Sequence, residues 1–284
     1  MKKIYSLTLL FICAFVFQSN AQYYYQLSST PGNPGGLNTD DEYPNGSGLP
    51  PGWSVILSGS NSSPTWSSTE TIPFSFNFNG SAVTQYKVSS SGVLTFNTGA
   101  TTVPSYTNAA IPNASIPDQS VLIWGIQGIG ANDNIVTKTF GTAGGQQHWI
   151  FFSSYDGGGS WSYWSIVLEE GTDRIYVVDQ RHSTAANPQV TAGIQIDGST
   201  AVMVSGSPNL GNLAGADPTA ADNYYYEFIQ GTPAAVDMAM TSLSVAPTVE
   251  AGSTSITGIV TSNSSNNITS IDISWNDGTG ANSE

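Results

Sequence analysis

Cysteine is almost absent from this chain of 284 residues, and the single one, Cys13, lies close to its start. It falls in an apolar run that follows Lys2 and Lys3 and is too short to span a bilayer. Small and polar residues then lead to Ala21, as in a secretory signal peptide. The sequence therefore predicts a signal peptide at 1–21, cleaved after Ala21, and a secreted or cell-surface protein. The mature chain would have no thiol, which excludes disulfides and cysteine chemistry from it.

Basic residues are also scarce, because six Lys and Arg stand against twenty Asp and Glu. Loss of Lys2 and Lys3 with the signal peptide leaves four basic residues and a formal net charge of −16. Such a surface repels phosphate groups, which excludes nucleic acid as a partner and disfavours anionic membranes. No second run of about 18 apolar residues occurs, so no transmembrane helix is predicted. Association with the outer-membrane surface stays open.

Helical spacing of apolar residues is nearly missing, and short alternating runs recur between clusters of Gly, Pro, Asn and Asp. This pattern predicts an all-β chain that forms an antiparallel sandwich of two sheets. The clearest hairpin joins 148–155 to 161–169 through an Asp-Gly-Gly-Gly turn, and Asp197-Gly198 marks a second hairpin turn between 190–197 and 201–204. The other expected strands are 74–78, 86–88, 93–96, 121–126, 174–178, 190–197, 201–204 and 224–229.

Two long stretches, 28–68 and 98–118, lack this alternation and are rich in Pro, Gly, Ser and Asn. Loops of such length in a compact domain often carry function or wrap a sheet edge. Two runs of three tyrosines, 23–25 and 224–226, suit strands that open and close the domain. We expect these two strands to pair and to bring the ends of the domain together.

Composition also divides the chain into parts. The predicted sandwich domain covers 22–231, a Thr-Pro-Ala-Ala linker covers 232–235, and an Ig-like module covers 236–284. In the last part Ile271, Ile273 and Trp275 alternate with polar residues, which indicates one buried face. Ig-like sandwiches need about 100 residues, so a truncated module and a longer parent protein are expected.

The segments 73–80 (PFSFNFNG) and 86–96 (YKVSSSGVLTF) resemble a known group of proteins. The pattern F-x-F-x-F-x-G, followed by V-S-x-x-G-x-L-x-F, resembles paired strands in large surface proteins of Bacteroidota and in nidogen-like extracellular domains. Together with the domain order, it resembles the outer-membrane-protein-28-related proteins, which use type IX secretion. The resemblance implies a jelly-roll or nidogen-like sandwich and a location on the outer cell surface. It transfers no catalytic residue.

Four aromatic residues form the main binding candidate: Trp149, Trp161, Tyr163 and Trp164. Alternation places Trp161 and Tyr163 on one face of their strand and Trp164 on the other. One face should lie in the core. The other face is either exposed, where flat rings stack on sugars or anchor a protein, or covered by the second sheet and the long loops. Both readings stay open at this point.

Asp40, Asp41 and Glu42 are adjacent in the first long stretch and are candidate Ca²⁺ ligands. Hard cations take six to eight oxygen ligands, often from loop carboxylates and carbonyls. The chain has no EF-hand spacing, however, and Asp and Asn favour turns for backbone reasons alone. Apart from this candidate cation, the sequence indicates no cofactor.

Catalytic groups are few, since His148 and His182 are the only histidines. Asp179 lies three residues before His182, and regular strand alternation would put the two on opposite faces. The sequence has no G-x-S-x-G elbow and no local set of zinc ligands. A chain without enzymatic activity is therefore predicted.

Together these features predict an exported cell-surface or extracellular module for binding or adhesion, whose ligand is a glycan or a protein. An alternative is an accessory, non-catalytic region of a secreted multidomain enzyme whose catalytic domain lies beyond residue 284. A purely structural spacer is a third reading, which complete burial of the aromatic faces would favour.

Overall fold

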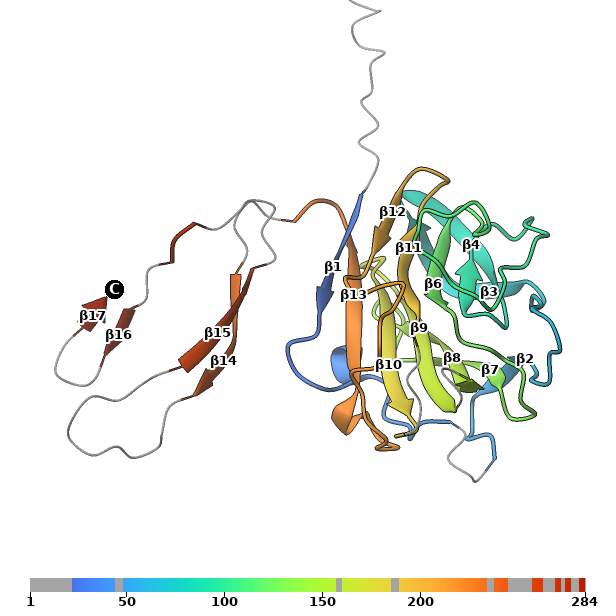
Figure 1. Ribbon diagram of the computed structural model, residues 1–284, viewed down its shortest axis with the longest axis horizontal. Coiled ribbons are helices and arrows are strands. Elements are labelled where there is room, and N and C mark those ends of the chain that lie inside the picture. Colours follow the sequence, from blue (N-terminus) through green and yellow to red (C-terminus); the bar gives the residue numbers. More distant parts are fainter. Residues whose placement is uncertain are drawn as a thin grey trace, which may run out of the picture.

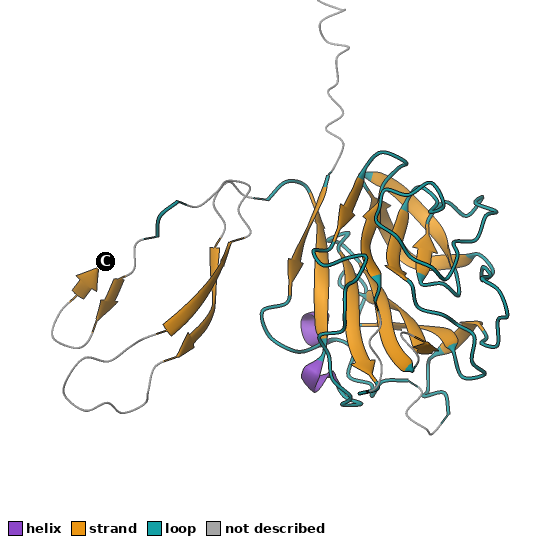
Figure 2. Ribbon diagram, in the orientation of Figure 1, coloured by secondary structure: helices purple, strands orange, loops and turns teal. Residues whose placement is uncertain are grey.

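The computed structural model describes residues 22–43, 48–156, 160–184, 189–233, 238–244, 257–262, 269–271, 274–276 and 281–283 (Figure 1). The predicted signal peptide at 1–21 and part of the predicted linker at 232–235 lie outside these residues. Regular structure is nearly all β-strand, with two single-turn 3₁₀ helices, η1 (Pro34–Gly36) and η2 (Ala220–Asp222) (Figure 2).

Two antiparallel sheets form a sandwich, which confirms the predicted fold class (Figure 1). The first sheet has the order β1-β13-β10-β9-β8-β7-β2. Its strands are β1 (Tyr23–Leu27), β2 (Ser54–Leu57), β7 (Asn134–Phe140), β8 (Gln147–Asp156), β9 (Trp161–Glu169), β10 (Ile175–His182) and β13 (Tyr224–Gln230). The second sheet has the order β12-β11-β6-β5-β4-β3. Its strands are β3 (Glu70–Phe78), β4 (Ser81–Val88), β5 (Val93–Thr95), β6 (Ser120–Trp124), β11 (Thr191–Gln195) and β12 (Ala201–Met203).

The observed strand pairing agrees with the prediction at the hairpins whose turns contain Asp-Gly sequences. The predicted β8–β9 and β11–β12 hairpins are both present. The expected pairing of the two tyrosine-bearing strands is confirmed, since β1 pairs antiparallel with β13 and Tyr25 lies opposite Phe228. Gly231 also donates its backbone N–H to the carbonyl of Gln22, so the two ends of this sheet edge meet. β2 and β7 were not predicted.

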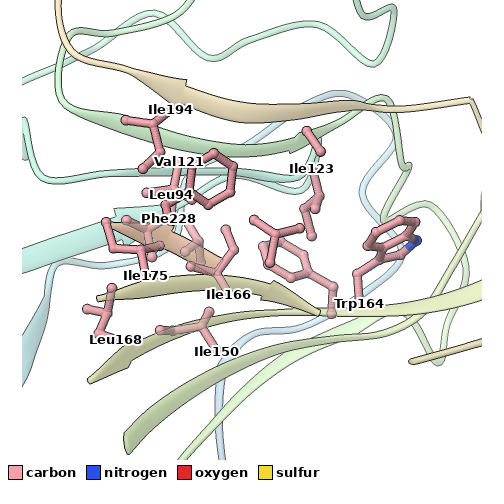
Figure 3. Close-up of a cluster of buried hydrophobic side chains, with 14 of the residues drawn as sticks. Leu94, Val121, Ile123, Ile150, Trp164, Ile166, Leu168, Ile175, Ile194 and Phe228 are labelled. Atoms are coloured by element: carbon pink, nitrogen blue, oxygen red, sulfur yellow. The ribbon is translucent and has the colours of Figure 1, made fainter. Parts of the chain in front are cut away.

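The space between the sheets holds the main core (Figure 3). Along β9, Trp164, Ile166 and Leu168 point into this core, as the alternation predicts. From the second sheet, Val121 and Ile123 meet them. Each fully buried large apolar side chain contributes roughly 1.5–3 kcal/mol. A core of this size replaces the disulfides that the chain cannot form.

Part of each long stretch covers the outer face of one sheet, and residues 54–57 of the first stretch form β2 at the edge of the first sheet. Residues 28–43 and 48–53, here called the first cover, place Tyr43 and Trp53 on the outer face of the first sheet. Residues 98–118, the second cover, place Ile111 and Ile116 against Trp124 on the outer face of the second sheet. Both sheets are therefore apolar on two faces, which explains the continuous apolar run of β6.

Beyond the sandwich, four short strands form two antiparallel pairs. β14 (Met238–Ser244) pairs with β15 (Thr257–Ser262), and β16 (Ser274–Asn276) pairs with β17 (Ala281–Ser283). Ile271, predicted to face a core, is half exposed. In the part of the chain that the structure describes, no helix has the length and apolar character needed to cross a membrane.

Candidate functional site

The outer face of the first sheet contains three of the four predicted binding residues. Alternation in β9 directs Trp161 and Tyr163 to this face, and Trp149 of β8 lies beside them. Trp164 points the other way and is fully buried in the main core. The sequence predicted this division of β9 correctly, but it left open whether the outer face is covered.

The first cover buries most of that outer face. Trp53 contacts Phe140 and Phe151 edge-on, with ring centroids 5.8 and 5.7 Å apart. Trp149 is fully buried beneath this layer, and Tyr163 is 6% exposed. Both therefore stabilise the cover and are inaccessible to a ligand.

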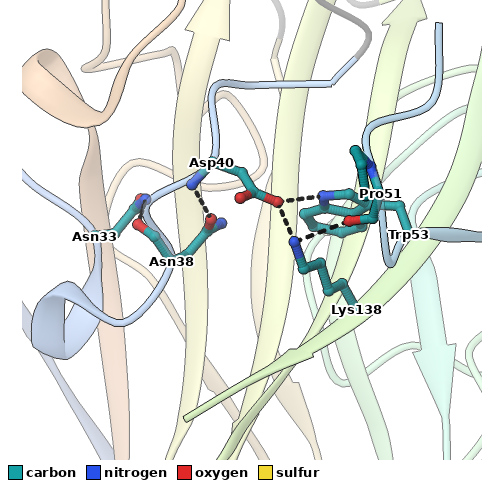
Figure 4. A network of polar contacts seen from close by, with 6 residues as sticks. All are labelled: Asn33, Asn38, Asp40, Pro51, Trp53 and Lys138. Atoms are coloured by element: carbon teal, nitrogen blue, oxygen red, sulfur yellow. Dashed lines mark hydrogen bonds and ion pairs between the residues drawn. The ribbon is translucent and has the colours of Figure 1, made fainter.

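A polar network anchors the first cover at its edge (Figure 4). The Asp40 carboxylate accepts hydrogen bonds from Lys138 Nζ at 2.5 Å and from Trp53 Nε1 at 2.8 Å. The Lys138 ammonium lies 4.7 Å from the ring centroid of Phe140, a cation–π contact. One oxygen of Asp40, which the sequence suggested as a Ca²⁺ ligand, is thus engaged in an ion pair with Lys138.

Trp161 is the predicted aromatic residue that stays partly accessible, because the first cover leaves it half-buried. Its ring meets Tyr163 edge-on, with centroids 5.4 Å apart. The Arg181 guanidinium lies 4.9 Å from the Trp161 ring and 5.6 Å from the Tyr163 ring. Arg181 Nε donates to the carbonyl of Ala216 at 3.1 Å, which fixes its orientation. The Trp161 ring and the Arg181 guanidinium thus lie together at the surface, with the Tyr163 ring against both.

Sequence reasoning missed Arg181 because a β-bulge sets its direction. The register of β10 against β9 shifts between Asp179, which faces Trp164, and Arg181, which faces Tyr163. The extra residue turns Arg181 to the outer face, which is a known effect of bulges. No feature of the local sequence marks this position.

The bulge also corrects the expectation for Asp179 and His182. His182 lies opposite Ser162 and Asp179 opposite Trp164, so both point to the inner side of the sheet rather than to opposite faces. They still form no catalytic pair. The Asp179 carboxylate accepts hydrogen bonds from Asn212 Nδ2 and from the backbone of residues 213 and 214. Burial raises its pKa to about 7, against the lowering effect of these hydrogen bonds.

His148, the other histidine, lies at the inner side of β8 and is almost fully buried. One ring nitrogen is 2.8 Å from the hydroxyl of Tyr86 and the other is 3.0 Å from that of Thr139. Burial lowers the pKa of His148 to about 4, so the ring is neutral at physiological pH. Both nitrogens are engaged, which gives this histidine a structural role.

Glu42 lies near the segment before β13, whereas Asp40 pairs with Lys138. It is 3% exposed, and burial raises its pKa to about 9, although Arg181 and Asn223 nearby lower it in part. The Glu42 backbone N–H donates to the carbonyl of Pro218 at 2.9 Å. The Asp40-Asp41-Glu42 cluster predicted from the sequence is thus divided, because Asp40 is paired with Lys138. Within the described ranges, no group of three or more His, Cys, Asp and Glu side chains could hold a metal ion.

Comparison with known proteins agrees with this geometry. A family model described as NIDO related matches residues 52–238, from the end of the first cover to the start of β14. This match contains both sheets except β1. No curated protein and no solved structure matches the chain.

Proposed function

Because the chain belongs to the NIDO-related family, whose domains are typical of extracellular proteins, we propose that it is an exported binding or adhesion module without catalytic activity. Its ligand-binding surface is centred on Trp161 and Arg181. The ligand is a glycan or a protein, which contacts the rigid aromatic ring of Trp161 and the positive charge of Arg181. The alternation of β9 and the bulge of β10 hold the two side chains in place.

The observation that supports this proposal most is the contact between Trp161 and Arg181. Tryptophan and arginine are the residue types that contribute most to binding at protein surfaces, because they combine large contact area with directional polar groups. The Trp161 indole offers a flat face for a sugar ring or an apolar side chain. The Arg181 guanidinium has donors beyond the Nε–H that Ala216 occupies, and these suit carboxylates and hydroxyls.

Two of the groups that could perform acid–base chemistry, His148 and Asp179, are held in structural roles, which supports a non-enzymatic function. His148 is enclosed between Tyr86 and Thr139. Asp179 is fully buried and accepts three hydrogen bonds from the 212–214 segment. Neither group reaches the Trp161 surface.

The proposed location is the outer surface of the cell. It is supported by the signal-peptide pattern at 1–21 and by the acidic composition of the chain. The segments 73–80 and 86–96, which resemble surface proteins exported by type IX secretion in Bacteroidota, form β3, β4 and β5 of the sandwich.

A glycan array combined with a whole-cell adhesion assay tests this function. The full chain and its Trp161→Ala variant are compared with Trp66→Ala as a matched control. Trp66 is also half-buried and lies under a cation, since Lys87 Nζ is 4.8 Å from its ring, but it lies on the opposite sheet. Thermal unfolding of each variant confirms that it is folded.

We expect the wild-type chain to bind at least one glycan, matrix protein or cell type. Trp161→Ala should weaken this binding about tenfold or more, in line with the loss of one central aromatic contact, whereas Trp66→Ala should leave it unchanged. Absence of any binding by the wild-type chain, or equal losses in the two variants, contradicts the proposed surface.

A further inference from the structure

Four of the buried oxygens without hydrogen-bond partners belong to residues where the first cover meets the chain before β13. They are both carboxylate oxygens of Glu42, Oδ1 of Asp222 and Oδ1 of Asn223. Glu42 is 3% exposed and Asn223 is fully buried. Buried polar atoms are almost always satisfied in folded proteins, so four unpaired acceptors in one region require an explanation.

Backbone hydrogen bonds join the segment that contains Glu42 to the segment that contains Asp222 and Asn223, although 180 residues separate Glu42 from Asp222 in sequence. Gly32 donates its N–H to the carbonyl of Asn223 at 2.8 Å, and Glu42 donates to that of Pro218 at 2.9 Å. The side-chain Nδ2 of Asn223 donates to Asn33 at 2.8 Å, which leaves the amide oxygen as its free end.

Asp222 and Asn223 both act on Glu42. The charge of Asp222 raises the pKa of Glu42, and the side chain of Asn223 lowers it by favouring the charged form. No hydrogen bond of ordinary length reaches either Glu42 oxygen. One oxygen of Asp222 accepts the backbone N–H of Gly215 at 2.8 Å, which leaves its second oxygen for another partner.

When Glu42 is ionised, as it must be to bind a cation, all four unpaired atoms are acceptors, and this decides what would satisfy them. A single water donates only two hydrogen bonds, so it cannot serve four acceptors. A cation serves them together, and two carboxylates balance the charge of a divalent ion. Carboxylate and amide oxygens are the ligands of hard cations such as Ca²⁺.

We propose that Glu42, Asp222 and Asn223 bind one Ca²⁺ ion, which ties the first cover to the segment before β13. These residues provide four oxygens, and water or backbone carbonyls complete the six to eight that Ca²⁺ takes. The site contains two carboxylates, so it does not conflict with the absence of larger acidic groups in the described part of the chain.

The charges around the site indicate modest affinity. Arg181 lies near Glu42 but is held over Trp161 and by Ala216, and it forms no ion pair with Glu42 among the described residues. Its positive charge still opposes a cation, whereas Asp217 favours one, since it acts on Glu42 with the opposite sign. We expect a Kd of roughly 10⁻⁴–10⁻³ M, the range of extracellular Ca²⁺ modules.

Calcium binding is tested on the full chain by isothermal titration with CaCl₂ and by thermal unfolding in 10 mM CaCl₂ against EDTA. The test variant is Glu42→Gln, which keeps the shape of the side chain. The matched control is Glu70→Gln, because Glu70 lies on the second sheet and bonds only locally with Ser68. A parallel titration with MgCl₂ measures selectivity, since Mg²⁺ demands a tighter octahedral site.

The expected result is one Ca²⁺ per chain and a rise in Tm of roughly 3–10 °C with Ca²⁺. Glu42→Gln should weaken binding at least tenfold and remove the rise in Tm, while Glu70→Gln retains both. Three results overturn the proposal: no binding by the wild-type chain, unchanged binding by Glu42→Gln, or equal losses in the two variants, which would indicate diffuse binding to the acidic surface. None of them bears on the Trp161 surface, which is measured separately.

Discussion

The two covers each bury the outer face of one sheet, but they differ in how their polar groups are hydrogen-bonded. The second cover is fixed by hydrogen bonds that leave no buried side-chain acceptor unpaired within 98–118. Gln195 donates to the carbonyls of Asn113 and Ile116 and accepts from the Asn113 backbone. Where the first cover meets the segment before β13, by contrast, both carboxylate oxygens of Glu42 and one side-chain oxygen each of Asp222 and Asn223 lack hydrogen-bond partners. The difference agrees with the proposal that the first cover takes part in binding Ca²⁺, whereas the second cover has a structural role.

The same contrast applies to the exposed aromatic residues. Trp66, beside the second cover, donates its indole N–H to Thr102 and is covered by Lys87. Trp161, at the margin of the first cover, shares its accessible face with Arg181. Both proposed functions, ligand contact and Ca²⁺ binding, therefore lie on the outer side of the first sheet.

The largest expected effect concerns the second cover. Gln195→Leu should lower the free energy of unfolding by about 3–5 kcal/mol, because it leaves buried backbone groups of Asn113 and Ile116 without partners. Urea unfolding measures the change. Ser199→Ala, at an exposed turn on the same sheet, should stay within about 0.5 kcal/mol. A loss below 1 kcal/mol for Gln195→Leu would show that this cover is not anchored as described.

Asp179 on the first sheet should make a pH-dependent contribution to stability. The folded state raises the pKa of Asp179 from 3.8 to about 7, so it holds a proton that the unfolded chain has released. Its contribution is therefore fully favourable below about pH 4 and is lost as the pH rises through 7. The wild-type chain should lose on the order of 3 kcal/mol relative to Asp179→Asn over this interval.

The measurement is urea unfolding of both proteins at pH 4, 5.5 and 7. The contributions of all other titrating groups cancel when the unfolding free energy of one protein is subtracted from that of the other. Asp197→Asn, at a fully exposed turn, serves as the control and should show no such trend over this range. If the difference in unfolding free energy between the wild-type chain and Asp179→Asn does not change with pH, the pKa of Asp179 is not raised in the folded protein.

A smaller effect on stability, of opposite sign to that of Gln195→Leu, is expected for Glu42→Gln. In EDTA at pH 8, Glu42→Gln should raise the free energy of unfolding by about 1 kcal/mol or more, because burial raises the pKa of Glu42 to about 9 and the carboxyl must take up a proton on folding, which a neutral amide need not do. Urea unfolding again measures the change, with Glu70→Gln as the control. A loss of stability from Glu42→Gln under these conditions would show that the carboxylate is satisfied by the protein itself.

The smallest effect concerns the edge of the first cover. Lys138→Met removes the ion pair with Asp40, whose two side chains are 21% and 25% exposed, and should cost about 0.5–1 kcal/mol. The cost should shrink in 1 M NaCl, because salt screens the pair in the wild-type protein. A cost of 3 kcal/mol, independent of salt, would indicate that the Asp40 network stabilises the cover far more than an accessible ion pair can.

Local patterns in the sequence predicted much of the fold. Turn residues and period-two alternation identified the β8–β9 and β11–β12 hairpins and the two faces of β9. β2 was missed because its four residues lie in a stretch rich in Pro and Gly, and β7 because its polar positions hide the alternation. Strands of this kind gain their stability from neighbours rather than from their own pattern.

The candidate site was less predictable, because its residues meet through long-range packing. Asp40, Asp41 and Glu42 are neighbours in sequence, but the chain directs Asp40 to Lys138 and buries Glu42 near Asp222. Arg181 reaches the outer face only through a one-residue bulge. Neither event has a local sequence pattern, so only the folded arrangement reveals them.

The most direct test of the difference between the two covers is a crystal structure of the full chain grown with Ca²⁺ and measured at a wavelength where calcium scatters anomalously. We expect one anomalous peak, surrounded by oxygens of Glu42, Asp222 and Asn223, and none beneath the second cover. A map with no peak at Glu42, in which water or a protonated carboxyl group satisfies these oxygens, would contradict the assignment of the first cover as the ligand-binding side.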